Sequence, residues 1–433
     1  MAGGKWLMTA GLLLAAARPA SAQERSVTLE EAITRSWAVQ PRVVQAMGAT
    51  RTAGAQVLQA KGAFLPNLNL NAGGSRFYSE QNRIDNTTGL PVSSGVTTRN
   101  LNTSVTSSVE IFDGFRRSAT LGAANADERA AEAGLRDARF QQALQTTNTF
   151  FDALAASRLV AVREASLRRA EEQLKVSVAR YQAGAATRSD SLRSLVGVGN
   201  AQLQLVTAQA QLATAEAALG RLIGEGARVQ ATDDSAFYRI ITGLDEASLR
   251  AEVVSQSPVV ISAQEDYRAA QANLKVARAQ YWPSLSLSGS YNLDGSSNNN
   301  YTMAASNRLN LSFSWPLFNR FNRETQMAQA AVARDNARAA EDDARRGVQA
   351  DLTARLADLA AAELRIQITE RSVQAAAEDL RVQQERYRLG ASTILDVATT
   401  QEALTQAEVD AVTARFDYLR AKASIEALIG RTL

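Results

Sequence analysis

The chain contains no cysteine and no histidine among its 433 residues. Without cysteine it can form no disulfide, carry no lipid on a cysteine after a leader and use no thiolate nucleophile. Without histidine it lacks the usual imidazole base and the commonest zinc ligand. Its polar loops also lack paired carboxylates that could replace these groups. We therefore predict that the protein is not an enzyme and binds no cofactor and no metal ion.

An excess of charge of one sign is missing as well. The formal net charge is +3, and Lys5 and Arg18 contribute part of it at the start of the chain. A protein so close to neutrality does not carry the basic surface that nucleic acid requires. No nucleic-acid partner is expected.

Long hydrophobic runs are absent after residue 22. Residues 1–22 have the order of a secretory signal peptide, with Lys5, an apolar stretch at 6–17 and small residues at 20–22 that suit cleavage. An uncleaved anchor helix is the alternative, but the apolar stretch is shorter than the roughly 20 residues that span a bilayer. Because no later segment is long enough, a mature chain in a membrane would have to form a closed β-barrel.

Proline is scarce, and it is missing from two long stretches, Arg116–Tyr181 and Asn322–Leu389. Both stretches are rich in Ala, Gln, Glu, Arg and Leu, which are strong helix formers. Each stretch predicts a helix about 100 Å long, because an α-helix rises about 1.5 Å per residue. A second helical pattern follows each of them, at Ser191–Ile223 and Leu395–Ile429.

The sequence is duplicated. Residues 180–184 (RYQAG) recur at 386–390 (RYRLG), 222–224 (LIG) at 428–430, 62–66 (GAFLP) as 279–283 (AQYWP), and 111–113 (IFD) as 317–319 (LFN). The duplication predicts repeats at 23–224 and 244–433, joined by a linker at 225–243.

Apolar residues in the long helical patterns recur every seven residues. The seams are Leu352, Leu359, Ile366, Val373, Leu380 and Tyr387; Val160, Leu167, Leu174 and Tyr181; Val198, Leu205, Leu212 and Leu219; and Leu404, Ala411, Tyr418 and Ile425. A sevenfold repeat predicts supercoiled, packed helices. By itself this pattern is equally typical of a filament or a plain helical bundle.

Four shorter segments alternate between apolar and polar residues. The apolar sets are Leu68, Leu70 and Ala72; Leu101, Val105, Val109 and Ile111; Leu285, Leu287, Gly289, Tyr291 and Leu293; and Leu309, Leu311, Phe313, Trp315 and Leu317. Ser, Asn and Thr occupy the alternate positions, so each strand has one lipid-compatible and one wet face. A soluble sheet packed on a core is the alternative.

Four strands cannot close a barrel with an open lumen, so several chains are expected to share one barrel. The connecting segments Ser79–Arg99 and Asp294–Asn307 are predicted to be polar loops.

Aromatic residues gather where the predicted strands meet the helices. They are Phe64, Phe112, Tyr281, Trp282, Trp315 and Phe318. We expect these residues to lie at the lipid interface.

With its duplicated plan, its Arg-Tyr-x-x-Gly turns, the segment 393–397 (TILDV) and its Leu-Ile-Gly ends, the whole mature chain resembles the TolC-like outer-membrane efflux proteins. The resemblance implies a homotrimer, in which a coiled-coil α-barrel in the periplasm continues into a transmembrane β-barrel with four strands from each chain. It implies a passive exit duct for efflux or type I secretion. It also implies that a periplasmic adaptor docks on the tunnel tips and that an inner-membrane RND or ABC pump supplies the energy. The linker 225–243 would then form part of a belt around the tunnel.

The tips are the turns between paired helices. Gly184 and Gly390 suit a left-handed helix end, and Thr187 with Asp190, and Thr393 with Asp396, have capping-box spacing. Asp396 fits a cap and a carboxylate ring at the tunnel mouth equally well, whereas a cap is favoured for Asp190. The exposed turn residues expected to meet an adaptor are Gly184, Ala185, Gly390, Ala391 and Ser392.

The family holds its tip shut with an arginine and a second aspartate near this turn, and Ser392 and Thr399 stand at those positions here. The remaining candidates for closing the mouth are Arg180, Tyr181, Arg386 and Tyr387, although heptad packing explains the two tyrosines at least as well. We therefore expect a weak latch.

Two other functions are alternatives. A coiled-coil tether between the outer membrane and the cell wall needs no wet strand face, and an outer-membrane enzyme would lack His and Cys. The sequence does not identify the cargo, because drugs, metal ions and secreted polypeptides would all pass through a wide, water-filled tube.

Overall fold

The structure is a computed structural model that describes residues 25–84, 87, 89–239 and 245–433. The expected signal peptide, residues 1–22, lies outside the described residues, as does the end of the expected linker from residue 240 onward. Within these ranges no helix combines the length and the apolar character that crossing a bilayer requires.

The chain divides into two compact units, each assembled from three stretches of sequence. One contains Met1–Val39, Gln145–Arg239 and Glu363–Arg420, and the other contains Gln40–Leu144, Ile240–Ala362 and Ala421–Leu433. Each unit draws on both halves of the duplicated sequence.

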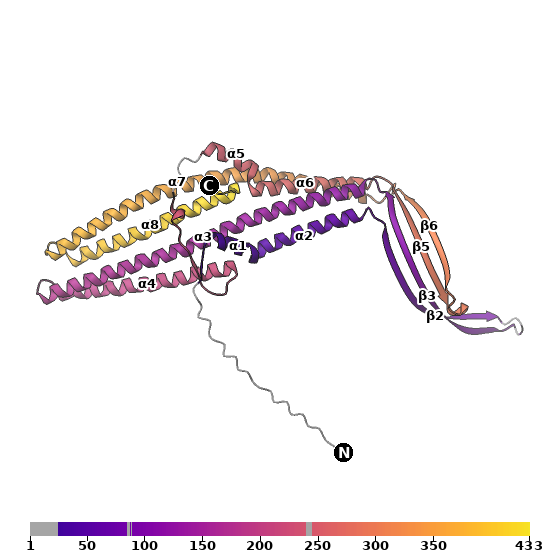
Figure 1. Cartoon of the computed structure of the whole chain (residues 1–433), viewed down its shortest axis with the longest axis horizontal. Helices are drawn as coiled ribbons and strands as arrows, with labels where there is room; N and C mark the ends of the chain where they lie inside the picture. The colour runs from indigo at the N-terminus through magenta and orange to yellow at the C-terminus, as the bar shows by residue number, and fades with distance from the viewer. Residues whose placement is uncertain (1–24, 85–86, 88, 240–244) are drawn as a thin grey trace, which may run out of the picture. The chain divides into compact units, whose positions relative to one another are not determined.

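The second unit contains an antiparallel four-stranded sheet (Figure 1). Its strands are β2 (Asn67–Ile84), β3 (Pro91–Phe112), β5 (Ser284–Ser296) and β6 (Ala304–Ser314), in the order β2-β3-β5-β6. The helices α2 (Pro41–Gly62) and α6 (Pro258–Ala279) end just before β2 and β5, and Pro66 and Pro283 lie between helix and strand as predicted. A short helix, α5 (Glu246–Gln256), precedes α6, and a 3₁₀ turn, η2 (Ser297–Asn299), follows β5.

The predicted loop Ser79–Arg99 is wrong for most of its length. β2 pairs with β3 without interruption from Asn67 opposite Ser108 to Ile84 opposite Pro91. Backbone hydrogen bonds between the strands hold this extension, although its side chains no longer alternate clearly. Likewise, β5 continues to Ser296 and β6 begins at Ala304, which shortens the predicted loop Asp294–Asn307.

Two helical hairpins follow the strands, as predicted (Figure 1). They are α3 (Arg116–Gln182) with α4 (Arg188–Ile223), and α7 (Asn322–Arg388) with α8 (Ile394–Ile429). The helix α4 begins three residues before the predicted Ser191, because Thr187 is its N-cap. In both repeats the Leu-Ile-Gly end supplies a left-handed glycine, Gly224 with φ 82° and Gly430 with φ 76°.

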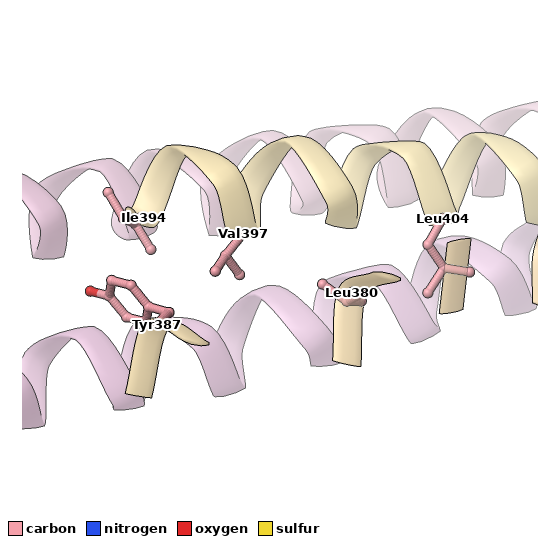
Figure 2. Close-up of a cluster of buried hydrophobic side chains, with 5 residues drawn as sticks. All are labelled: Leu380, Tyr387, Ile394, Val397 and Leu404. Carbon is pink, nitrogen blue, oxygen red and sulfur yellow. The ribbon is translucent and has the colours of Figure 1, made fainter. Parts of the chain in front are cut away.

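The first unit contains the turn ends of both hairpins. The α7–α8 seam is buried as the heptads predict, and Leu380, Tyr387, Ile394, Val397 and Leu404 form one apolar cluster (Figure 2). The α3–α4 seam differs from the prediction: Leu167 and Leu174 are only half-buried, whereas Ser177 and Ser194 are buried and their hydroxyls lie 2.8 Å apart. Small residues of α4 at heptad spacing, Ser194, Ala201 and Ala208, occupy the buried stripe.

The first unit also holds residues 25–39 and most of the predicted linker, up to Arg239. Here β1 (Arg25–Val27) pairs in parallel with β4 (Val229–Ala231), next to α1 (Leu29–Val39) in sequence. A 3₁₀ turn, η1 (Ser235–Tyr238), brings Phe237 edge-on to Phe150 and Phe151 of α3, with ring centroids 6.2 and 5.6 Å apart. Aromatic packing therefore holds the linker against the helix.

Candidate functional site

The register of the sheet places the alternating residues on two chemically different faces. Directly paired residues in antiparallel strands project to the same side. The pairs Leu70 with Val105, Val109 with Leu287, and Leu287 with Leu311 therefore define one apolar face. This face is open to solvent within one chain, since Leu68 is 74% exposed and Leu309 is 76% exposed. A soluble sheet would cover such residues with a packed layer.

The opposite face is polar. Asn69 pairs with Thr106, Thr106 with Ser290, and Ser288 with Asn310. A hollow of about 470 Å³ on these residues also includes Arg308. Arg308 is a functional candidate that the alternation pattern alone did not indicate, although it occupies a polar position of that pattern and its charge is evident in the sequence.

A β-bulge changes which residue continues the apolar face. The register of β3 against β5 shifts between Glu110 and Phe112, so that Phe112 pairs with Leu285. Strict alternation would have assigned this face to Ile111, as predicted, and would have turned Phe112 to the other side. The bulge therefore places Phe112 on the apolar face. The predicted position of Phe112 at the lipid interface requires this placement.

The aromatic residues at the strand-to-helix junctions form the same arrangement in both repeats. The ring of Phe112 meets Phe115 edge-on at 5.6 Å, and the ring of Phe318 meets Phe321 edge-on at 5.4 Å. Phe115 and Phe321 both have left-handed backbones, with φ 65° and 61°. This conformation strains the backbone of a residue other than glycine, and such strain is commonly found at functional positions.

Two equivalent arginines connect these junctions. The guanidinium of Arg117 lies 5.2 Å from the centre of the Phe64 ring and donates to the carbonyl of Ile111 at 3.4 Å. In the second repeat, Arg323 lies 4.6 Å from the Tyr281 ring centre and donates to the carbonyl of Leu317 at 3.4 Å.

The last two predicted interface aromatics make different contacts. The indole of Trp315 donates to the carbonyl of Tyr281 at 3.3 Å. A Cβ built on Gly114 would lie 2.2 Å from the Cβ of Trp282, so the turn that carries Gly114 packs tightly on Trp282. Phe64 and Tyr281 are thus stacked by arginine, whereas Phe318 and Trp282 remain widely exposed.

Both predicted capping boxes form at the hairpin turns. The carboxylate of Asp190 accepts from the Thr187 amide at 3.1 Å, and that of Asp396 accepts from the Thr393 amide at 2.8 Å and from its hydroxyl at 2.9 Å. The hydrogen bonds from Thr393 hold the pKa of Asp396 below its ordinary value. Capping therefore explains the position of both aspartates.

Only one of the two candidate arginines crosses between the hairpins. Arg180 lies 4.4 Å from the centre of the Tyr387 ring, donates to the backbone carbonyl of Tyr387, and also donates to the carbonyl of Ala185 at 3.1 Å. Its counterpart Arg386 donates only to the carbonyl of Ala391 in its own turn, at 3.3 Å, among the hydrogen bonds found in the described chain. Arg180 therefore couples one turn to the other, and Arg386 does not.

The two candidate tyrosines have opposite environments. Tyr387 is 3% exposed within the α7–α8 cluster, whereas Tyr181 is 44% exposed. The hydroxyl of Tyr387 is buried and finds no hydrogen-bond partner in the described part of the chain.

The glycines at the tips adopt the predicted left-handed conformation, with φ 72° at Gly184 and 81° at Gly390. Ser392 donates to the carbonyl of Gln383 at 3.2 Å, and Thr399 donates to that of Leu395 at 2.9 Å. Both hydroxyls thus bond within their own hairpin, and neither takes the place of the family's latch residues.

The sequence profile of the outer membrane efflux protein family matches residues 28–225 and 249–431. The pyoverdine export outer membrane protein OpmQ of Pseudomonas putida is 24% identical over 65% of this chain, and the chain spans 60% of the length of that relative. The outer membrane protein TolC of Vibrio cholerae is 23% identical over 86% of this chain and 84% of its own length.

The fold is also found in solved structures. The outer membrane protein VceC of Vibrio cholerae superposes with a TM-score of 0.74 at 19% identity, over 93% of this chain and 96% of that one. The chain has the fold of TolC-like outer-membrane channels, and it belongs to the outer membrane efflux protein family.

Proposed function

We propose that this protein is the outer-membrane exit duct of a tripartite efflux or type I secretion system, and that it has no enzymatic activity. The observation that carries the proposal is the sheet with one exposed apolar face and one polar face, built on helices of about 100 Å. Lipid contacts the apolar face, and the polar face lines a water-filled lumen. Solutes then pass without chemistry, and the pump provides the energy.

The sheet favours assembly as a homotrimer. Within the described chain, β2 and β6 each pair with only one strand, so both edges of the sheet are available to another copy. Three copies would close one barrel. The repeats 23–224 and 244–433 would contribute equivalent helices and strands, and the linker 225–243 would serve as a belt anchored by Phe237.

The hairpin turns are the proposed periplasmic mouth. An adaptor protein would contact Gly184, Ala185, Gly390, Ala391 and Ser392, and so connect the duct to the inner-membrane pump. Arg180 would hold the mouth closed through Tyr387, with Asp396 and Asp190 contributing carboxylate rings beside Tyr181 and Arg386. The six aromatic residues of the junctions, Phe64, Phe112, Tyr281, Trp282, Trp315 and Phe318, would lie at the membrane surface.

Single-channel recording tests the proposal directly. The purified full-length protein in planar bilayers should assemble as a trimer and conduct ions, with larger currents once its adaptor is added. A trimer that inserts but never conducts, with or without adaptor, would restore the tether hypothesis. A soluble monomer would contradict both.

A further inference from the structure

A basic groove lies between the start of α3 and the end of α6. It has a volume of about 600 Å³, and small residues such as Gly122, Ala126 and Ala272 are part of its lining. Four cations line it: Arg129, Arg268, Lys275 and Arg278. Phe115 and Trp282 stand at one end, 67% and 59% exposed. Among the described residues that line the groove, none is acidic.

The cations of the groove differ in whether they are neutralised. Arg129 and Arg268 share Glu265, the former at 3.6 Å and the latter in closer contact. Lys275 and Arg278 form no ion pair with any acid in the described part of the chain. They are also the two cations nearest in sequence to Trp282. The unneutralised charge is therefore concentrated at the end of the groove where the exposed aromatic rings lie.

The aromatic end of the groove adjoins the apolar face of the sheet. Phe115 lines the groove and packs edge-on against Phe112. Phe112 in turn pairs with Leu285, which belongs to the apolar face. A separate hollow includes Asn67, Ser108 and Glu110 of the polar face together with Val109. If the apolar face contacts lipid, the aromatic end of this groove lies beside that lipid.

Counting along β3 gives the height of the groove relative to the bilayer. The apolar face runs from Phe112 to Leu101, and the next residue on that face, Arg99, pairs directly with Arg76. About ten residues at 3.3 Å, in a strand tilted by about 40°, span about 25 Å along the membrane normal, which matches the apolar band of an outer-membrane barrel. The end at Phe112 is therefore one margin of the band.

Lys275 and Arg278 lie just beyond this margin. Along α6 they precede Trp282 by seven and four residues, which corresponds to roughly 10 and 6 Å of helix rise. The polar headgroup layer on each side of a bilayer is about 5–8 Å thick, so Arg278 lies within it and Lys275 lies at its outer edge. We propose that the groove binds the phosphate of an anionic phospholipid in the periplasmic leaflet, with Lys275 and Arg278 on the phosphate and Phe115 and Trp282 against the acyl chains.

This assignment rests on the proposed function, because it takes the apolar face to be in the outer membrane. Its chemistry is otherwise independent of conduction. Two unneutralised cations at an anionic lipid surface each contribute about fivefold in affinity, and hence about thirtyfold together. A zwitterionic lipid of the same chain length carries a compensating charge and gains much less.

Native mass spectrometry of the detergent-purified full-length protein can test the site, with phosphatidylglycerol and phosphatidylcholine of matched acyl chains as probes. The wild type should retain phosphatidylglycerol preferentially. The double variant Lys275→Gln/Arg278→Gln should lose about thirtyfold in affinity for phosphatidylglycerol and little for phosphatidylcholine. The matched control Arg338→Gln/Arg371→Gln removes two exposed cations of α7 and should leave both affinities unchanged.

Three results would overturn the proposal: equal retention of the two lipids by the wild type, equal loss in the control, or displacement of the lipid by soluble glycerophosphate at the same concentration. The last result would indicate a site for a free phosphate ester. The charge-preserving variant Lys275→Arg/Arg278→Lys should keep the preference and so separates charge from misfolding. Conductance of the same preparation distinguishes the two ideas, since a conducting trimer without lipid preference would refute only the groove.

Discussion

The two helical hairpins descend from one duplicated plan, yet they are packed by different chemistry. The α7–α8 pair is joined by large apolar side chains around Tyr387, whereas the α3–α4 pair is joined by Ser177, Ser194 and small residues. The equivalent tyrosines are 3% and 44% exposed. Duplication therefore preserved the turns and caps but not the seams. The α7–α8 hairpin holds itself together, while the α3–α4 hairpin leaves its larger apolar residues available to other helices.

Arg180 adds a second asymmetry. It lies over the ring of Tyr387 and bonds to the Tyr387 backbone, whereas Arg386 bonds within its own turn. A mouth closed in this way depends on one residue from the first repeat and one from the second. Three pairs of matched substitutions and one single substitution can test the comparison.

Replacement of the tyrosines should give the largest difference. Tyr387→Ala should destabilise the protein by about 3–5 kcal/mol, because it leaves a cavity in a buried cluster. Tyr181→Ala should change stability by no more than about 0.5 kcal/mol, because the side chain is exposed. Melting temperature and the rate of proteolysis within α7–α8 would measure both.

Tyr387→Phe is the control for this pair. It keeps the ring but removes a buried hydroxyl that lacks a partner in the described chain, so it should be neutral or stabilising by about 1 kcal/mol. A marked loss of stability would instead show that this hydroxyl bonds to a neighbouring copy in the assembly. Equal effects of Tyr387→Ala and Tyr181→Ala would refute the contrast between the hairpins.

The arginines should give the next largest difference. Arg180→Gln removes a stacked guanidinium and its hydrogen bonds between the hairpins, which together contribute about 2 kcal/mol to closure. The open state should then be about thirtyfold more populated, and the isolated trimer should leak in planar bilayers. Arg386→Gln should leave the closed conductance unchanged. Arg180→Lys should be intermediate, since an ammonium cannot reproduce the planar stack. A tightly shut Arg180→Gln trimer would show that other groups form the latch.

Substitutions at the two turn glycines, Gly184 and Gly390, should differ less from each other in their effect on stability. Alanine at either position must adopt a left-handed backbone, at a cost of about 1–2 kcal/mol. A side chain larger than alanine should have different effects at the two positions. A Cβ at Gly390 would lie 3.7 Å from a guanidinium nitrogen of Arg180, whereas a Cβ at Gly184 would have nothing within 4 Å. Because Gly390 also belongs to the proposed adaptor contact, Gly390→Leu should abolish efflux, measured as drug tolerance, while trimers still assemble and insert. Gly184→Leu should be milder, and unchanged tolerance in Gly390→Leu would contradict the assignment of this tip.

The smallest expected effect is on pH dependence. The pKa of Asp396 is held below its ordinary value of 3.8 by hydrogen bonds from Thr393. Its stabilisation is therefore complete above pH 3.8 and is lost as the pH falls through the lowered folded pKa. Asp396→Asn should flatten that part of the curve of melting temperature against pH, and should change nothing near pH 7 apart from the loss of the cap itself. An unchanged acid limb in Asp396→Asn would show that the carboxylate is not the titrating group.

Local features were predictable from the sequence. The long helices, the capping boxes at Thr187 and Thr393 and the left-handed glycines all appear where the sequence predicts them. Each depends on residues within a few positions of one another, and their backbone preferences act independently of the rest of the chain. The alternating strands were predictable for the same reason, because the side-chain period of a strand is a local property.

Other features required the tertiary structure. The buried α3–α4 seam, the bulge that turns Phe112 to the apolar face and the reach of Arg180 to Tyr387 all join residues from distant parts of the chain or different strands. A heptad pattern shows which residues share a helix face, but not which of several neighbouring helices that face meets. The sequence by itself therefore determined the elements and their two kinds of surface. Only packing decided which of two equivalent residues is buried, because burial depends on contacts that the duplicated halves do not share.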